Sequence, residues 1–224
     1  MFQLPSPLQK IETALTRQFN IHLFIKRDDL IHPEISGNKW RKLKYNIEQA
    51  KQENKTTILT FGGAYSNHIT ATAAAGKYFG LRTIGIIRGE AYQPLNKSLK
   101  FATDCGMELV YVDREKYKTK NMDSFLTTQD SRLIYFLPEG GANELALKGC
   151  AEITNELDVD FDYICCACGT GTTIAGIASN LKPHQQAIGF AVLKHDKLQE
   201  EIIEKFPNLK SEISILNSHF GGYA

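Results

Sequence analysis

The chain has 224 residues, of which 42% are hydrophobic and 23% are charged. This mixture is typical of a globular protein and argues against a disordered, collagen-like or coiled-coil chain. Lys and Arg number 26 and Asp and Glu number 25, so the formal net charge of +1 indicates no nucleic acid and no anionic membrane as partner. At roughly 100 to 200 residues per domain, the length corresponds to one large domain or about one and a half smaller ones.

The chain carries no sign of secretion or of a membrane anchor. Its first ten residues contain Pro5 and Pro7 and no long apolar run, so we expect a cytoplasmic protein. Five cysteines, an odd number, fit a reducing compartment better than a disulfide framework. Residues 163–181 lack charge over the length of a membrane span, but the Gly and Thr residues at 169–173 have the composition of a loop.

Short β-branched runs alternate with longer amphipathic or Ala-rich stretches along the chain. The runs predict strands at residues 22–26, 57–61, 83–88, 108–112, 133–137, 163–168, 187–193 and 212–216. The stretches predict helices at residues 40–51, 67–79, 96–105, 145–157, 172–181 and 197–206, and the hydrophilic residues 113–132 predict a helix with a loose loop. This alternation predicts an α/β fold with parallel sheets, and continuous apolar runs such as 164–167 indicate burial on both faces.

Ligands of open parallel sheets bind beyond the carboxyl ends of the strands, where helices begin. The first such junction is Ser36-Gly37-Asn38-Lys39, which opens the helix that carries Trp40. A lysine at a helix start is slightly unfavourable to the helix dipole, so its presence there points to a function. The alternative is a lysine that is simply solvated.

The second junction is Gly62-Gly63-Ala64-Tyr65-Ser66-Asn67-His68, which follows a strand and leads into an Ala-rich helix. The glycines permit a tight turn, and Ser66 or Asn67 can cap the helix. A helix start also attracts an anion such as a substrate carboxylate, although an ordinary cap is an equal alternative. His68 could be a ligand or a base, but its place in the first turn favours a structural role.

The third junction is Gly169-Thr170-Gly171-Thr172-Thr173, directly after an apolar strand. Glycines let backbone amides approach an oxygen-rich anion and threonine hydroxyls add donors, which together predict a phosphate site. The loop is no P-loop, because no Gly-Lys-Thr or Gly-Lys-Ser follows. It also matches the dinucleotide fingerprint imperfectly, since Ile174 stands in place of the third glycine, but Asp196 keeps that alternative open.

Two other residue groups carry weaker signals. Cys165, Cys166 and Cys168 alternate along one strand and have no second Cys or His pair at zinc-finger spacing, so we expect buried apolar thiols and no metal. The chain has no Gly-x-Ser-x-Gly elbow, which argues against a serine hydrolase.

Taken together, the three junctions resemble the pyridoxal phosphate enzymes of the 1-aminocyclopropane-1-carboxylate deaminase and D-cysteine desulfhydrase group. The resemblance extends from the strand near Phe24 to Tyr223 and is most specific at residues 26–43, 61–76 and 167–176. It implies a tryptophan synthase β-like fold (fold type II), with two domains of three layers each around parallel sheets. Pyridoxal 5′-phosphate is the implied cofactor.

Matched residue by residue, the cofactor site has three parts. Lys39 resembles the lysine that binds the cofactor, and Asn67 resembles the asparagine that hydrogen-bonds the pyridine hydroxyl. The phosphate loop is matched by Gly169, Thr170, Gly171, Thr172 and Thr173.

The substrate side is matched by Ser66, which resembles a serine that carries a proton or takes part in ring opening. Asn67, His68 and Tyr223 are the other residues expected near the substrate. Many relatives have glutamine immediately before the serine, whereas this chain has Tyr65, so the match does not fix the substrate.

The resemblance implies a smaller α/β domain at residues 46–141 and a larger, cofactor-binding domain formed by residues 1–45 and 142–224. We count four strands for each, whereas the larger domain of the family has more. We therefore expect the larger domain to be truncated at its C-terminus, without the group that faces the pyridine nitrogen.

The expected function is a hydrolase or lyase reaction on a small amino acid. 1-Aminocyclopropane-1-carboxylate or D-cysteine would give an α-keto acid and ammonia, with sulfide from the thiol substrate. We expect a homodimer. The alternatives are an NAD-binding oxidoreductase or nucleotide-binding module that uses the Gly169 loop, and an inactive truncated remnant.

Overall fold

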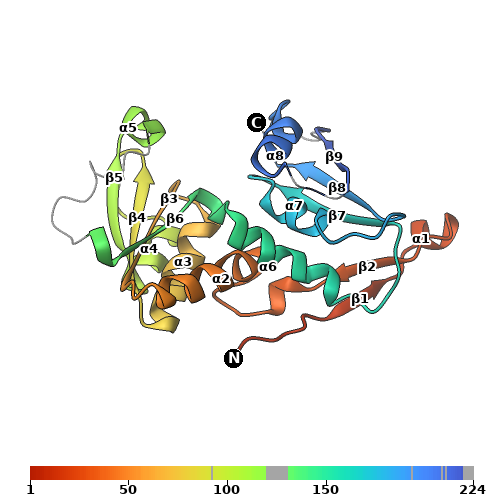
Figure 1. The fold of residues 1–224 in the computed structure, drawn as a ribbon, viewed down its shortest axis with the longest axis horizontal. Coiled ribbons are helices and arrows are strands. Elements are labelled where there is room, and N and C mark those ends of the chain that lie inside the picture. The colour runs from red at the N-terminus through yellow and green to blue at the C-terminus, as the bar shows by residue number, and fades with distance from the viewer. Residues whose placement is uncertain (92, 120–130, 193, 208, 210, 219–224) are drawn as a thin grey trace.

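The structure is a computed structural model that describes residues 1–91, 93–119, 131–192, 194–207, 209 and 211–218. Its strands form two parallel sheets and one antiparallel hairpin (Figure 1). The strands are β1 (Leu8–Ile11), β2 (Leu23–Lys26), β3 (Thr57–Gly62), β4 (Arg82–Arg88), β5 (Glu108–Val112), β6 (Ile134–Leu137), β7 (Tyr163–Cys168), β8 (Gln186–Ala191) and β9 (Ile213–Leu216). The α-helices are α1 (Ala14–Gln18), α2 (Asn38–Gln52), α3 (Asn67–Phe79), α4 (Lys97–Asp104), α5 (Arg114–Thr119), α6 (Glu144–Asn155), α7 (Thr172–Ala178) and α8 (Leu198–Lys205). Short 3₁₀ helices occupy Asp28–Leu30, Ser131–Leu133 and Glu139–Gly141.

The first parallel sheet has the strand order β5-β4-β3-β6. Its central strand β3 is buried along its whole length. Ile58 packs with α2 and α3 on one face, whereas Leu59 and Phe61 pack with Tyr117 of α5 on the other. Burial on both faces explains why β3 is a continuous apolar run.

The second parallel sheet has the order β7-β8-β9 and differs in its burial. Side chains of one face pack against α7 and α8, with Cys168, Ile174 and Ile202 in the core. On the opposite face Tyr163, Phe190 and Leu216 are 60%, 47% and 43% exposed. The prediction that the run at 164–167 is buried on both faces is therefore wrong, because within the described residues no layer covers this face.

The β1-β2 hairpin corrects a second prediction. Residues 22–26 were counted with the larger parallel sheet, but β2 pairs antiparallel with β1, with Leu8 opposite Lys26. Neither β1 nor α1 was predicted, because a four-residue run and a five-residue helix are too short for a periodic pattern. By contrast, β5, β7 and α3 have the predicted bounds.

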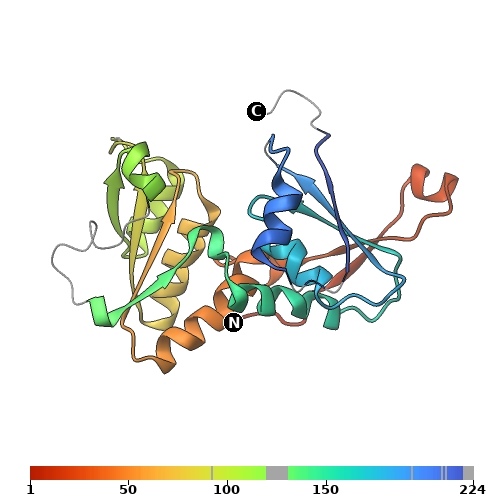
Figure 2. The same ribbon diagram turned by 45° about the horizontal axis from the view of Figure 1, so that its top comes forward.

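The helices α2, α6 and α7 pack in a row between the two parallel sheets. In Figures 1 and 2 α2 and α6 run from the first sheet toward the second, and α6 packs on both α2 and α7. Glycines permit this close packing: a Cβ at Gly149 would collide with the carbonyl oxygen of Arg41, and one at Gly176 would lie 2.5 Å from the Cβ of Cys150. The helices therefore fix the position of one sheet relative to the other.

A buried ion network holds the start of α2. Arg41 is fully buried, and its guanidinium donates to Asp28 at 2.9 Å and to Glu156 at 2.8 Å. Lys26 also pairs with Glu156, at 2.8 Å. Hydrogen bonds and charge from Arg41 and Lys26 outweigh the effect of burial and lower the pKa of Glu156 to about 2. The network ties β2, α2 and α6 to the same point.

The predicted domain bounds fall inside α2 and just before α6, and the division into 1–45 with 142–224 and 46–141 stays a proposal. Among the described residues, no helix combines the length and the apolar character that crossing a membrane requires.

Candidate active site

The predicted lysine lies at the start of α2. Gly37 precedes the helix with a φ of 63°, in the left-handed region that favours glycine. Lys39 Nζ donates to Asn38 Oδ1 at 2.8 Å, and Asn38 Nδ2 donates to Thr173 Oγ1 at 2.8 Å. Burial lowers the pKa of Lys39. Asn38 thus links the candidate lysine to Thr173 of the predicted phosphate loop, which lies 135 residues beyond Asn38 in the chain.

The predicted substrate loop lies at the start of α3. Ser66 Oγ caps this helix and accepts hydrogen bonds from the backbone N–H of His68 at 3.2 Å and of Ile69 at 3.4 Å. The Asn67 side chain is exposed, and Tyr65 is 80% exposed. Ser66 Oγ acts only as an acceptor in this cap, and within the described residues its hydroxyl hydrogen is not donated to any group.

The predicted phosphate loop joins β7 to α7. Gly171 has a φ of 73°, and a Cβ at this position would collide with the side chain of Ile202. Thr170 Oγ1 lies 3.4 Å from Thr172 Oγ1, and Thr172 and Thr173 are buried. Glycine is therefore required here, and the loop gathers three hydroxyl groups.

Lys42 is a site residue that sequence reasoning missed. Its side chain is buried, and its Nζ donates to the carbonyl oxygen of Gly140 at 2.9 Å and to Thr170 Oγ1 at 3.3 Å. Burial, with a smaller effect from the charge of Lys39, lowers the pKa of Lys42 to about 8. In the part of the chain that the structure describes, no carboxylate forms an ion pair with it. The available signal was its spacing of three from Lys39, which puts both amines on one face of a helix.

The turn Glu139–Gly141 brings the three junctions together. A Cβ at Gly141 would lie 3.2 Å from the Cβ of Lys42 and 3.5 Å from the Cε1 of His68. A Cβ at Gly140 would lie 2.9 Å from the Cγ2 of Thr170. The starts of α2 and α3 and the Gly169 loop therefore meet around one turn.

His68 is buried and does not face solvent. Its Nε2 lies 2.8 Å from Thr60 Oγ1, whereas its Nδ1 has no hydrogen-bond partner among the described residues. Burial and then the charges of Lys39 and Lys42 lower its pKa to about 3. The lowered pKa favours the neutral imidazole near neutral pH, which argues against an imidazolium that acts as a general acid.

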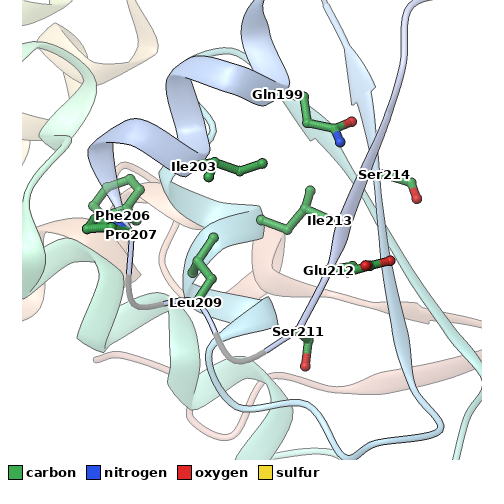
Figure 3. Close-up of a pocket in the computed structure, with 9 residues that line it drawn as sticks. All are labelled: Gln199, Ile203, Phe206, Pro207, Leu209, Ser211, Glu212, Ile213 and Ser214. Carbon is green, nitrogen blue, oxygen red and sulfur yellow. The ribbon is translucent and has the colours of Figure 1, made fainter.

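We compare two cavities of the described residues with the position of the candidate site. A pocket of about 440 Å³ between α8 and β9 is lined by residues such as Gln199, Phe206 and Ile213, and by no predicted site residue (Figure 3). A larger cavity of about 670 Å³ lies between β2 and β7 and is lined by Asn38 and Thr173 among others. Only the second reaches the candidate site.

The remaining predicted residues have mixed outcomes. Tyr223 lies outside the described residues. Cys166 and Cys168 share one face of β7, with sulfur atoms 3.9 Å apart, as predicted. Cys168 is buried and Cys166 is half-buried. Cys165 is exposed, so the prediction of buried thiols is wrong for this residue, because it lies on the uncovered face of the sheet.

The geometry fits an organic phosphate with a reactive carbonyl group. A buried lysine and three threonine hydroxyls provide cationic and neutral donors for phosphate oxygens. The poorly solvated amine of Lys39 suits covalent attachment to the carbonyl carbon. The residues present therefore fit pyridoxal phosphate.

Comparisons with known proteins agree with this chemistry. Residues 1–207 match the family described as "Pyridoxal-phosphate dependent enzyme". A Thermotoga maritima protein, provisionally assigned as a 1-aminocyclopropane-1-carboxylate deaminase, is 33% identical over 84% of this chain and 64% of its own length. A bifunctional D-cysteine desulfhydrase/1-aminocyclopropane-1-carboxylate deaminase of Arabidopsis thaliana is 33% identical over 70% of this chain and 44% of its own. The chain thus spans about half to two thirds of these relatives.

A solved structure supports the fold. The crystal structure of a 1-aminocyclopropane-1-carboxylate deaminase homologue has a TM-score of 0.78 and 27% identity and covers 96% of this chain and 72% of its own. The predicted fold is confirmed, and neither the NAD-binding alternative nor the inactive remnant is favoured. The names of these relatives describe deaminases and a desulfhydrase, so the predicted term hydrolase is loosely wrong for them. The chain belongs to the family of pyridoxal-phosphate-dependent enzymes.

Proposed function

We propose that this chain carries out the reaction of a deaminase or desulfhydrase on a small amino acid and uses pyridoxal 5′-phosphate. The observation that carries the proposal is the contact of two lysines of α2 with one loop: Lys39 through Asn38 to Thr173, and Lys42 to Thr170. The names of the relatives supply the substrate class, 1-aminocyclopropane-1-carboxylate or D-cysteine. The products would be an α-keto acid and ammonia, with sulfide from D-cysteine.

The cofactor would be held at both ends. Lys39 would bind it covalently, Lys42 and the hydroxyls of the Gly169 loop would bind its phosphate, and Asn67 would hydrogen-bond its ring hydroxyl. When bound, its ring withdraws electrons from the substrate bond that breaks. Burial favours the neutral amine of Lys39, which is the nucleophilic form.

Two residues would handle protons in the reaction. Lys39 Nζ would accept a proton from the substrate carbon, because burial lowers its pKa and so favours the neutral amine, the form that can take up a proton. Ser66 Oγ accepts two backbone N–H groups, which stabilise developing negative charge on the oxygen while its own hydrogen is given away. His68 is buried with its Nε2 on Thr60, so we do not assign it the role of the base.

The substrate carboxylate would lie at the start of α3. This helix has 13 residues, and the capped turn at Ser66 leaves the Asn67 side chain exposed toward solvent. A helix start attracts a carboxylate through its dipole, and since the amides of His68 and Ile69 already donate to Ser66 Oγ, the contact would come from the exposed Asn67 and the Ser66 hydroxyl. Ser66 and Asn67 are thus the proposed substrate-side residues, with Tyr223 as a further proposal from the sequence, whereas the side chain of His68, proposed from the sequence too, is buried.

The direct test is reduction with borohydride after addition of pyridoxal phosphate. We expect the label on Lys39, identified by peptide mass spectrometry, and its loss in Lys39→Ala. A panel of D- and L-amino acids with α-keto acid detection then defines the substrate. Absence of the label on Lys39 in a folded chain would refute the proposal.

We also propose a homodimer in the cytoplasm. All five cysteines are free, which suits a reducing compartment. Exposed Tyr163, Phe190 and Leu216 give the β7-β8-β9 sheet an apolar face of the kind that supports self-association. Light scattering coupled to size exclusion tests the dimer, and a monomer across the accessible concentrations would contradict it.

A further inference from the structure

The Asn38 side chain contacts two groups that belong to different parts of the candidate site. Its Oδ1 accepts a hydrogen bond from Lys39 Nζ at 2.8 Å, and its Nδ2 donates to Thr173 Oγ1 at 2.8 Å. An ammonium group can only donate, so it requires the amide oxygen to face it, and the amide NH₂ group then faces the threonine hydroxyl. Both contacts therefore favour the same orientation of the Asn38 amide.

Asn38 is fixed both at its backbone and at its amide group. It is the first residue of α2 and follows Gly37, whose φ is 63°. Its partner Thr173 is buried in the first turn of α7, and both side chains line the cavity of about 670 Å³. In the part of the chain that the structure describes, the Lys39 amine makes no other hydrogen bond. The direction of this amine therefore depends on Asn38.

The surroundings of Lys39 offer no opposite charge to its ammonium form. Three titratable groups interact with it: Lys42 on the same helix, His68 on α3 and Cys150 on α6. Among the described residues, no carboxylate forms an ion pair with Lys39. Burial lowers the pKa of Lys39 below its ordinary value of 10.5, and the neutral amide of Asn38 adds no charge that would oppose this effect.

We infer that Asn38 is a positioning residue for Lys39: anchored on Thr173, its amide oxygen holds one N–H of the amine and leaves the nitrogen lone pair free. A carboxylate could hold the same N–H, but its negative charge would stabilise the ammonium form, which has no lone pair to offer. The contact acts while the amine is free, before the cofactor is attached. The inference rests on the proposed function in taking Lys39 as the cofactor lysine.

The first test replaces the neutral acceptor by a charged one of the same shape, in the cofactor-free chain. Formaldehyde with cyanoborohydride methylates neutral amines, and mass spectrometry gives the rate at Lys39 as a function of pH. We expect Asn38→Asp to raise the midpoint of this profile by about one pH unit or more. An aspartate suits a helix start, so the variant should fold. Gln52→Glu, which adds the same charge at the far end of α2, should leave the midpoint unchanged.

The second test separates the direction of the amine from its charge. Asn38→Leu has a similar size but no acceptor, and Asn38→Ala is a second variant of this kind. Above the midpoint, methylation by the small formaldehyde molecule should stay within about a factor of three. Attachment of pyridoxal phosphate, followed as the borohydride label on Lys39, should slow about tenfold or more, because this larger reagent meets the amine in one geometry. Equal slowing of both reactions would show a merely structural role and overturn the inference.

The third test concerns the anchor on Thr173 and uses ¹H–¹⁵N NMR of the cofactor-free chain. The side-chain amide signal of Asn38 is the one that is absent in Asn38→Leu. It should shift in Thr173→Val, which lacks the acceptor, and stay close to its native position in Thr173→Ser. An unchanged signal in Thr173→Val, or an unchanged midpoint in Asn38→Asp, would also overturn the inference. If pyridoxal phosphate labels another lysine, the proposed function fails, whereas the methylation and NMR results on Asn38 stand.

Discussion

The two parallel sheets of this chain are buried to different degrees. β3 of the first sheet is enclosed on both faces, whereas in β7 and β8 of the second sheet buried or half-buried residues alternate with more exposed ones. Both sheets nevertheless supply a loop to the same site, the Ser66 loop after β3 and the Gly169 loop after β7. The contrast teaches that a site needs well-placed strand ends, even where a sheet is covered on one side only.

The largest expected effect is on the free energy of unfolding, and it appears when one phenylalanine from each sheet is replaced by alanine. Phe61 is fully buried and packs edge to face on Tyr117, with ring centroids 5.6 Å apart, whereas Phe190 is 47% exposed. We expect Phe61→Ala to lower the free energy of unfolding by about 3–5 kcal/mol, because it opens a cavity. Phe190→Ala should cost about 1 kcal/mol or less. Urea unfolding of both variants measures the difference, and equal losses would break the comparison.

The second expected effect concerns the loop that follows the enclosed sheet. Ser66→Ala removes the proposed proton carrier, and we expect turnover to fall about 10²- to 10⁴-fold. Cofactor binding should stay within a factor of two or so, since phosphate donors come from the other loop. Steady-state kinetics beside a cofactor titration separates the two. Ser66→Thr, which keeps the hydroxyl and the helix cap, is the matched control.

The sequence predicted the elements of both sheets but not their covering. Apolar runs mark β3 and β7 equally well, because composition reports how a strand is built and not which layer lies on it. Tyr163 and Cys165 show this limit, since both lie on the exposed face of a strand that was predicted to be buried.

The candidate site was also predicted only in part. The glycines and polar residues at three strand ends identified Lys39, Ser66 and the Gly169 loop, because strand ends and helix starts have a recognisable chemistry. Lys42 was missed, because a lysine in the first turns of an amphipathic helix has the pattern of a solvated face. Its burial depends on the turn at Gly140, which lies 98 residues away in the sequence.

The third expected effect concerns the buried ion network of Arg41, Asp28, Lys26 and Glu156, which joins α2 to β2 and α6. Glu156 has a folded pKa of about 2, below its ordinary value of 4.5. A depressed carboxyl pKa contributes stability that is complete above the unfolded value, so stability should fall as the pH decreases from about 4.5 toward 2, by on the order of 2 kcal/mol. Glu156→Gln should lose most of this acid-dependent step. Exposed Glu12, which pairs with Lys10 on the hairpin, provides the control in Glu12→Gln. An identical acid profile for native chain and Glu156→Gln would contradict the role of the network.

The smallest expected effect concerns Lys42, which belongs to neither sheet and touches loops from both sides of the site. Its contact with Thr170 is a charge-assisted hydrogen bond, so Lys42→Met should weaken cofactor binding about tenfold, which corresponds to about 1.4 kcal/mol. The pKa of Lys42 is about 8, and its charged form is the one that attracts phosphate. Cofactor affinity should therefore be full below this value and fall as the pH rises through it, and the variant should lack this step. Lys44→Met, on the same helix but paired with Glu152, should bind the cofactor normally. If the affinity of the native chain does not change with pH in this range, or if both variants lose the same affinity, the phosphate is held by the Gly169 loop without Lys42.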